Sequence, residues 1–102
     1  MNKYGAIKTT VDGITFDSKH EAQRYTELVL LLKEHEITNL CLQPIYEIRV
    51  NGKHVCNYIA DFRYTARDGK EIVEDAKGVK TPVYRLKKKL VKAIYGIDIV
   101  EV

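Results

Sequence analysis

The chain has 102 residues, 45% of them hydrophobic, and its 17 Lys and Arg against 14 Asp and Glu give a formal net charge of +3. This length excludes a second domain, and one domain of this size buries roughly 60 to 70% of the surface that its unfolded chain exposes. The longest aliphatic stretch, residues 28–32, is too short to span a bilayer, and no apolar run typical of a signal peptide opens the chain. We therefore expect a single soluble domain, residues 1–102, in the cytoplasm.

The first part of the chain predicts a hairpin followed by a helix. Asp12-Gly13 lies between stretches rich in β-branched residues, which is typical of a hairpin turn. Ser18 and Glu21 form an S-x-x-E capping box, and apolar residues then recur at helical spacing. The helix is expected to begin at Ser18 and to end near His35.

The middle of the chain predicts an antiparallel meander. The turn signals Asn51-Gly52 and Asp68-Gly69 separate stretches rich in β-branched and aromatic residues. We expect strands over residues 45–50, 53–65 and 70–77, with a bend or bulge in the long second strand.

The last part predicts a second helix and a final strand. Thr81 is the expected N-cap, Pro82 the first helical residue and Gly96 the stop. Apolar residues recur at helical spacing between them: Val83, Leu86, Leu90 and Ile94. Residues 97–102 then read as a strand. The fold class is α/β, more closely an α+β mixed sheet flanked by helices.

Two carboxylates and a lysine on neighbouring strands are the main candidate for chemistry. Because side chains alternate along a strand, Asp75 and Lys77 point the same way, while Glu74 and Ala76 point the other way. Asp61 lies one hairpin upstream. Mg²⁺ prefers oxygen ligands, and one or two carboxylates with substrate phosphate oxygens can hold it. The alternative is a solvent-facing strand with a salt bridge, although an ionised carboxylate on a central strand is costly to bury without a partner.

Glu21 has two possible roles. It completes the capping box, and this alone would explain it. It also borders the apolar stripe of the helix, so it can face the sheet and add a metal ligand.

The second helix carries a stripe of positive charge. Arg85, Lys88, Lys89 and Lys92 follow one side of the helix, Lys80 precedes it, and residues 76–95 contain no acid. A solvated lysine face is the alternative, but like charges at this spacing repel until a polyanion neutralises them, which favours contact with nucleic-acid phosphates. Gln43, before Pro44, could orient a water molecule or contact the substrate backbone, or could simply be an edge residue.

The two cysteines predict no covalent or metal chemistry. Cys41 and Cys56 would pair only in an oxidising compartment, which nothing in the chain suggests. A zinc site of Cys41, His54 and Cys56 lacks the usual spaced cysteine pairs. Both are expected to be reduced thiols.

In order along the chain, these residues resemble the PD-(D/E)XK nuclease superfamily and, more closely, a family of small phage-encoded proteins within it. The resemblance covers nearly the whole chain and rests on Tyr4-Gly5-Ala6, residues 11–19, Glu21-Ala22, Arg24-Tyr25, Leu42-Gln43-Pro44, residues 58–62 and residues 73–78. It departs at Ala60, where the superfamily motif has a proline.

The resemblance implies a restriction-endonuclease-like αβββαβ core with an N-terminal β hairpin. It implies that Asp61 and Asp75, the carbonyl of Ala76 and the carboxylate of Glu21 bind Mg²⁺ or Mn²⁺. It further implies that Lys77 assists the attacking water.

The expected function is a metal-dependent DNA endonuclease, selective for branched or duplex DNA in the manner of a Holliday-junction resolvase and acting in phage recombination or replication. A two-fold homodimer would suit such a substrate. Two alternatives are a nucleic-acid-binding module without turnover and a phage regulatory protein whose basic stripe meets an acidic partner.

Overall fold

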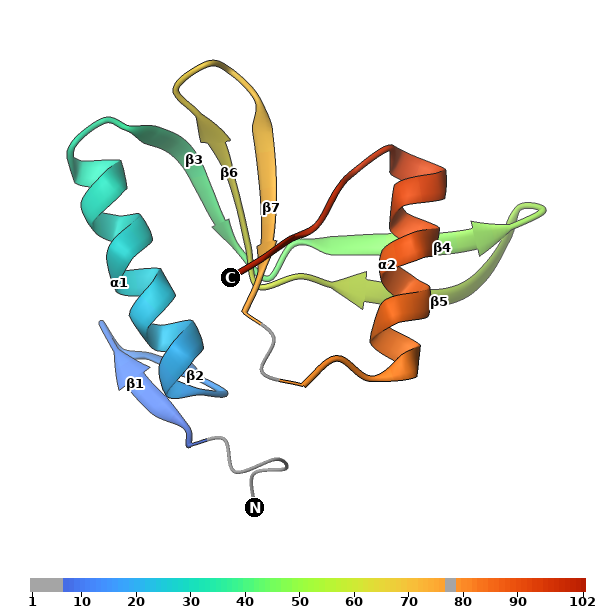
Figure 1. The fold of residues 1–102 in the computed structure, drawn as a ribbon, viewed down its shortest axis with the longest axis horizontal. Coiled ribbons are helices and arrows are strands. Elements are labelled where there is room, and N and C mark those ends of the chain that lie inside the picture. The colour runs from blue at the N-terminus through green and yellow to red at the C-terminus, as the bar shows by residue number, and fades with distance from the viewer. Residues whose placement is uncertain (1–6, 77–78) are drawn as a thin grey trace.

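The computed structural model describes residues 7–76 and 79–102, an α+β domain whose described part has two helices and eight strands (Figure 1). The elements are β1 (Thr9–Val11), β2 (Ile14–Phe16), α1 (Lys19–Lys33), β3 (Ile37–Leu42), β4 (Ile45–Val50), β5 (Lys53–Ile59), β6 (Phe62–Ala66), β7 (Glu71–Asp75), α2 (Pro82–Tyr95) and β8 (Val100–Glu101). Neither helix is long and apolar enough to cross a membrane, a finding limited to these described residues.

The predicted turns and helix ends are confirmed. Asp12-Gly13 and Asn51-Gly52 each have two consecutive positive φ angles, 52° and 76° in the first and 51° and 76° in the second. This is the backbone that a tight two-residue hairpin requires. The Ser18 side chain accepts a hydrogen bond from the backbone N–H of Glu21, and Thr81 caps α2 in the same way. The chain therefore folds locally as its turn and cap residues predict.

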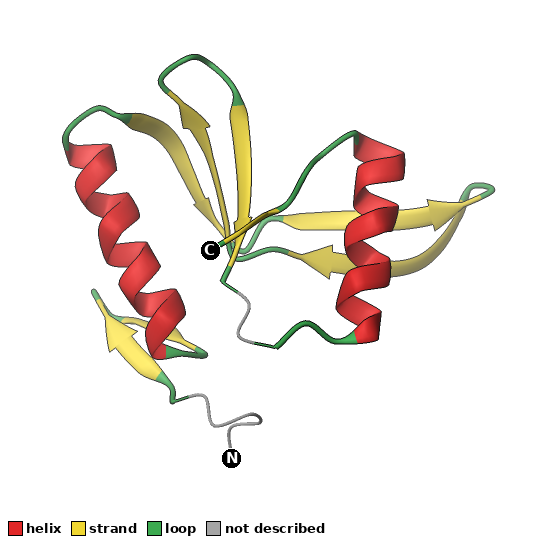
Figure 2. Ribbon diagram, in the orientation of Figure 1, coloured by secondary structure: helices red, strands yellow, loops and turns green. Residues whose placement is uncertain are grey.

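The two helices lie on opposite sides of a central sheet (Figure 2). Its strand order is β3-β6-β7-β8, with β7 and β8 parallel and the other neighbours antiparallel. One core cluster lies under α1 and includes Leu28, Phe62 and Tyr64. The other joins α2, β7 and the β4–β5 ribbon and includes Ile48 and Val91. The two cores meet along β6 and β7.

The single strand expected over residues 53–65 is wrong. β5 pairs only with β4, and β6 belongs to the central sheet, so the chain changes sheets at Ala60 and Asp61. Backbone bonds hold this crossing: Ala60 N–H donates to the Pro44 carbonyl (3.1 Å) and Asp61 N–H to the Glu74 carbonyl (3.1 Å). The alternation of buried residues hides the break, because it continues through the crossing: Tyr58 and Ala60 belong to the α2 core, and Phe62 and Tyr64 to the α1 core.

Strand β3 was missing from the prediction. It pairs with β6, but its register shifts between Thr38 and Cys41, and Asn39 between them has a φ of 56°. Such a bulge disturbs the alternation of apolar and polar residues by which strands are recognised. The expected final strand over residues 97–102 is shorter than predicted, since only Val100–Glu101 forms it.

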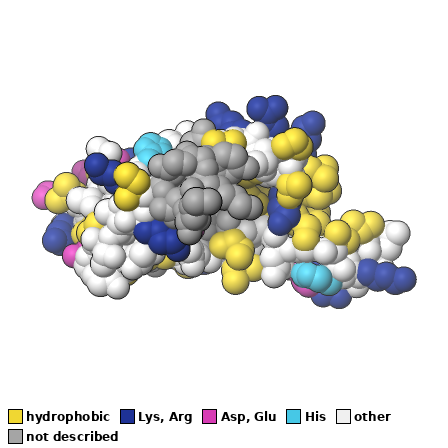
Figure 3. Space-filling view, turned by 90° about the horizontal axis from the view of Figure 1, so that it is seen from below, with side chains coloured by type: hydrophobic (Ala, Val, Ile, Leu, Met, Phe, Trp, Pro, Cys, Tyr) yellow, Lys and Arg dark blue, Asp and Glu magenta, His cyan; other side chains and the backbone are white. Residues whose placement is uncertain are grey.

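The apolar side of α2 is largely exposed. An amphipathic helix normally buries its apolar stripe, yet Val83, Leu86 and Ile94 are 61%, 58% and 44% exposed. Tyr84 and Val91 are the residues of α2 that are buried instead. In Figure 3 hydrophobic side chains gather on the α2 half of the surface.

Cys41 and Cys56 are free thiols, as predicted.

One substitution in each helix tests this assignment of core and surface. Leu28 is fully buried and Leu86 is 58% exposed. Leu28→Ala is expected to lower the free energy of unfolding by about 2–5 kcal/mol, whereas Leu86→Ala should change it by less than about 0.5 kcal/mol. Urea titration monitored by circular dichroism measures both. Equal losses would mean that α2 packs through a different face.

Candidate functional site

Three acidic side chains from separate elements meet where the two cores join. Asp61 lies between β5 and β6, Asp75 ends β7, and Glu21 lies in the first turn of α1. The carboxyl groups of Glu21 and Asp61 are in hydrogen-bonding contact, and Asp75 acts on Glu21 electrostatically. The fold therefore places Glu21 beside Asp61 and within electrostatic reach of Asp75.

Asp61 is held by the backbone that follows Asp75. Its Oδ2 accepts a hydrogen bond from the Ala76 N–H (2.7 Å). The Ala76 backbone thus lies beside Asp61, where its carbonyl was expected to act. Lys77, the predicted assistant of the attacking water, lies outside the described residues. Gln43 lies next to Asp61, because its backbone N–H donates to the Asp61 carbonyl (2.9 Å). The residue is exposed and has a φ of 52°.

Asp75 is fully buried and has a tyrosine partner that sequence reasoning missed. The Tyr58 hydroxyl, from β5, donates to Asp75 Oδ2. Burial raises the pKa of Tyr58, and the hydrogen bond with Asp75 raises it further. The sequence carries no signal for this pairing, because the alternation of buried residues around Tyr58 is the same whether or not its hydroxyl has an acidic partner.

The electrostatics of Glu21 favour its protonated form. Burial raises the pKa of the Glu21 carboxyl, repulsion from Asp17 adds to this, and Asp75 contributes in the same direction. The hydrogen bond with Asp61 acts in the opposite sense. A bound cation would favour the ionised form of Glu21 and release its proton.

Glu21→Gln is expected to stabilise the protein without metal and to reduce its stabilisation by Mg²⁺. With a folded-state pKa above the usual 4.5, Glu21 adds stability that is fully present below that pH and is lost as pH rises through the raised value. Glutamine cannot ionise, so the loss disappears. Urea unfolding at neutral pH, in EDTA and in excess Mg²⁺, measures both effects.

A carboxylate at the other end of α1 provides the control. Glu34 is exposed and caps the C-terminus of the helix. Glu34→Gln should leave the Mg²⁺ effect unchanged. If the Glu21→Gln protein gained as much stability from Mg²⁺ as the parent does, Glu21 would not be a ligand.

The donor set matches a hard divalent cation in kind. Carboxylate and backbone carbonyl oxygens are the ligands of Mg²⁺, which also keeps several waters. Two of the three carboxylates are buried, Glu21 at 7% and Asp75 at 0% exposure, which is costly for ionised groups without a positive partner. Among residues 7–76 and 79–102, no three His, Cys, Asp or Glu side chains already form a metal-binding cluster.

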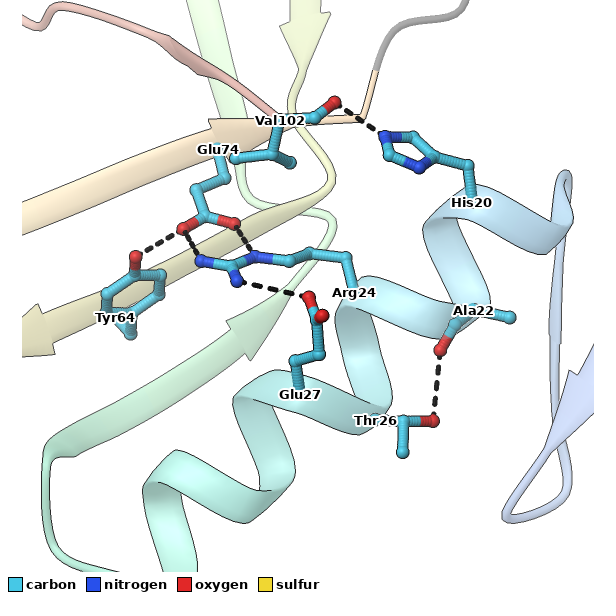
Figure 4. A network of polar contacts seen from close by, with 8 residues as sticks. All are labelled: His20, Ala22, Arg24, Thr26, Glu27, Tyr64, Glu74 and Val102. Carbon is cyan, nitrogen blue, oxygen red and sulfur yellow. Dashed lines mark hydrogen bonds and ion pairs between the residues drawn. The ribbon is translucent and has the colours of Figure 1, made fainter.

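A buried ion pair ties α1 to β7 beside this site (Figure 4). Arg24 Nε and Nη2 donate to the two carboxylate oxygens of Glu74, each at 2.7 Å, and the Glu74 side chain is only 1% exposed. Tyr64 also donates to Glu74, and Arg24 donates to Glu27 (3.2 Å). Glu74 thus faces α1, opposite to Asp75, as strand alternation predicted. Its partner Arg24 was missed because a pairing across 50 residues leaves no local pattern.

The predicted basic stripe lines one groove of about 500 Å³. The groove is lined by Lys80, Arg85, Lys88, Lys89 and Lys92, together with Asp98 and Glu101. Figure 3 shows Lys and Arg side chains gathered along the upper edge of the same half of the molecule. The picture of a stripe without acids needs correction, because the C-terminal segment brings two. Glu101 contacts Lys80 and Lys88 at 3.5 Å each, and Asp98 contacts Lys92 at 2.8 Å.

Together these features define an α+β domain in which the carboxylate cluster, meaning Glu21, Asp61 and Asp75, lies near a basic groove. The chain belongs to the family described as "Protein of unknown function (DUF1064)", which it matches over residues 1–99. No curated protein and no solved structure matches the chain.

Proposed function

We propose that this protein is a metal-dependent phosphodiesterase that cleaves DNA, with a site of the PD-(D/E)XK type in a restriction-endonuclease-like core. The observation that carries the proposal is the meeting of Glu21, Asp61 and Asp75, which come from a helix, a sheet crossing and a strand end. Two of these carboxylates, Glu21 and Asp75, are buried, and a positive charge beside them would stabilise their ionised forms. A divalent cation supplies such a charge.

Asp61, Asp75, Glu21 and the Ala76 carbonyl would hold Mg²⁺ or Mn²⁺. When bound, the metal lowers the pKa of water and neutralises charge on the phosphate. The protein's own groups orient this donor set: the Ala76 N–H fixes Asp61, and the Tyr58 hydroxyl fixes Asp75. A catalytic part for Lys77 is supported by the sequence resemblance.

The α2 groove would bind the DNA backbone on both sides of the cleaved bond. Its lysines and arginine would contact phosphates, which position the substrate without reading its sequence. Gln43, exposed at the rim of the carboxylate cluster, would contact the strand being cut. A two-fold homodimer would present two such sites to a branched or duplex DNA.

One observation favours a second candidate, a regulatory protein that binds another protein. Val83, Leu86 and Ile94 leave an apolar stripe of α2 open, and such stripes are common docking surfaces. Protein binding and DNA cleavage are compatible, since the apolar stripe of α2 and the carboxylate cluster lie on different parts of the molecule. A third candidate, a DNA-binding module without turnover, predicts binding that is indifferent to metal.

A cleavage panel tests the proposal. The purified protein is incubated with linear duplex, flap and four-way-junction DNA in Mg²⁺, Mn²⁺ or EDTA, and products are resolved on denaturing gels. We expect cleavage with either metal, preferentially of branched DNA, and none in EDTA. If no DNA is cut under any of these conditions, the enzymatic proposal is wrong.

A further inference from the structure

Glu101 lies between the carboxylate cluster and the basic groove. In the parallel pairing of β7 and β8 it is the register partner of Asp75, so the two side chains start from neighbouring positions on one face of the sheet. It also lines the α2 groove. Glu101 therefore has its side chain in the groove and its backbone next to that of Asp75.

Three donors converge on the Glu101 carboxylate. The Tyr84 hydroxyl donates to Oε2 at 2.7 Å, Lys88 Nζ lies 3.5 Å from the same oxygen, and Lys80 Nζ lies 3.5 Å from Oε1. The hydrogen bond from Tyr84 lowers the pKa of Glu101, and Lys88 and Lys80 lower it further, so the carboxylate stays ionised. One hydroxyl and two ammonium groups around an anion form a site for a tetrahedral oxyanion as well as for a carboxylate.

We propose that Tyr84, Lys80 and Lys88 form a subsite for a nucleic-acid phosphate, and that Glu101 occupies it as an internal competitor until the substrate displaces it. The inference rests on the proposed function, in that DNA is taken as the ligand of the groove. It adds the hydroxyl of Tyr84 to the basic residues that would bind phosphate. It also assigns Glu101 the opposite effect, since its carboxylate would weaken phosphate binding.

The subsite is coupled to the carboxylate cluster through a pair of tyrosines. The rings of Tyr58 and Tyr84 lie with centroids 6.3 Å apart, and Tyr58 donates to Asp75. Burial raises the pKa of Tyr84, with Glu101 and Asp75 contributing. A phosphate held by Tyr84 would therefore lie close to the group proposed to bind the metal, as a neighbour of the cleaved phosphodiester must.

The charge of the groove favours a phosphate chain over an acidic protein. Five basic side chains line it against two acidic ones, and Arg85, Lys88, Lys89 and Lys92 follow one another along the helix. A polyanion with evenly spaced charges meets such a row repeatedly, and each neutralised phosphate releases counterions. The net positive charge remains after Glu101 and Asp98 are counted.

The test measures DNA binding by fluorescence anisotropy in EDTA over a series of salt concentrations, so it requires no cleavage. Glu101→Gln is expected to tighten binding about 3- to 10-fold and to steepen the slope of log affinity against log salt by about 0.9, the effect of one more neutralised phosphate. Glu36→Gln is the matched control, because it removes the same charge from an exposed pair with Arg67. It should leave affinity within about 2-fold, since exposed pairs far from the ligand contribute little.

Two further variants keep the test decisive. Lys88→Gln should weaken binding, and more so in the Glu101→Gln background, because the lysine is then free to meet phosphate. Tyr84→Phe should remove part of the gain from Glu101→Gln. Unchanged or weaker binding by a folded Glu101→Gln protein would overturn the competitor role.

The outcomes separate this inference from the proposed function. If the parent binds DNA and cuts it but Glu101→Gln has no effect, only the subsite is wrong. If the parent binds no DNA even at low salt, the DNA interface of the proposed function and the subsite fall together. If poly-glutamate binds the Glu101→Gln protein as tightly as DNA does, the groove serves an acidic protein and the phosphate assignment is wrong.

Discussion

Asp75→Asn is expected to lower the rate of Mg²⁺-dependent DNA cleavage by at least about 100-fold, because loss of a direct ligand should exceed the roughly 10- to 100-fold loss typical of disturbing an outer partner of a metal ligand. Asparagine keeps the shape of the side chain and can still accept the hydrogen bond from Tyr58, but it lacks the negative charge that a cation needs. Cleavage rates with saturating protein and a range of Mg²⁺ concentrations measure the effect.

The same variant should remain folded and bind DNA. Because Asp75 is fully buried, removing its charge also removes a cost of desolvation, so stability in EDTA should equal or exceed that of the parent. DNA affinity in EDTA should be unchanged, since the groove on α2 is intact. Asp68→Asn is the matched control, because Asp68 is exposed in the β6–β7 turn, away from the groove and the carboxylates. Full activity in a folded Asp75→Asn protein would refute its role as a ligand.

Arg24→Gln is expected to lower the free energy of unfolding by about 3–5 kcal/mol, the cost of removing one partner from a buried ion pair. Glu74 would lose both 2.7 Å hydrogen bonds while its side chain, 1% exposed, could not reach water. For a domain of this size each kcal/mol corresponds to roughly 4–8 °C, so the melting temperature should fall by about 12 °C or more. Calorimetry or thermal circular dichroism measures this.

A surface pair provides the comparison. Arg67 contacts Glu36 at 3.0 Å, but both side chains are well exposed, at 75% and 47%. Arg67→Gln should therefore cost less than about 1 kcal/mol. If Arg24→Gln were no more harmful than Arg67→Gln, the pair between α1 and β7 would not hold the fold.

The ion pair also bears on the site. Arg24 lies one turn after Glu21 on α1, and Glu74 directly precedes Asp75 on β7. The bidentate contact therefore fixes the helix that carries one carboxylate against the strand that carries another. Arg24→Lys, which keeps the charge but loses the planar fork, should bind Mg²⁺ more weakly than the parent even where it remains folded.

Much of the local structure could be predicted from the sequence. The turns at Asp12-Gly13 and Asn51-Gly52 and the caps at Ser18 and Thr81 depend on residues within a few positions of one another, and the structure confirms them. Of the acidic candidates, Glu21 lies beside Asp61 and within electrostatic reach of Asp75. Asp61 and Asp75 could be selected from the sequence because an ionised side chain in an apolar stretch is costly to bury. Their role as metal ligands stays a prediction.

Apart from β3, which a local bulge hid, the misses have a tertiary cause. The pairing of Arg24 with Glu74 and the contact of Glu101 with Lys88 join different elements, and the sheet crossing at Ala60 and Asp61 depends on which partners β5 and β6 take elsewhere in the chain. None leaves a periodic pattern around the residues concerned.

By itself, the sequence determined where this chain turns, where its helices begin and which acidic side chains lie in apolar surroundings, because those properties follow from backbone preferences and the cost of burying charge. Only the tertiary structure decided that α2 buries Tyr84 and Val91 in place of its regular apolar stripe, and that Glu101 enters the basic groove. Those outcomes depend on the balance of contacts across the whole fold, where many weak and distant interactions compete.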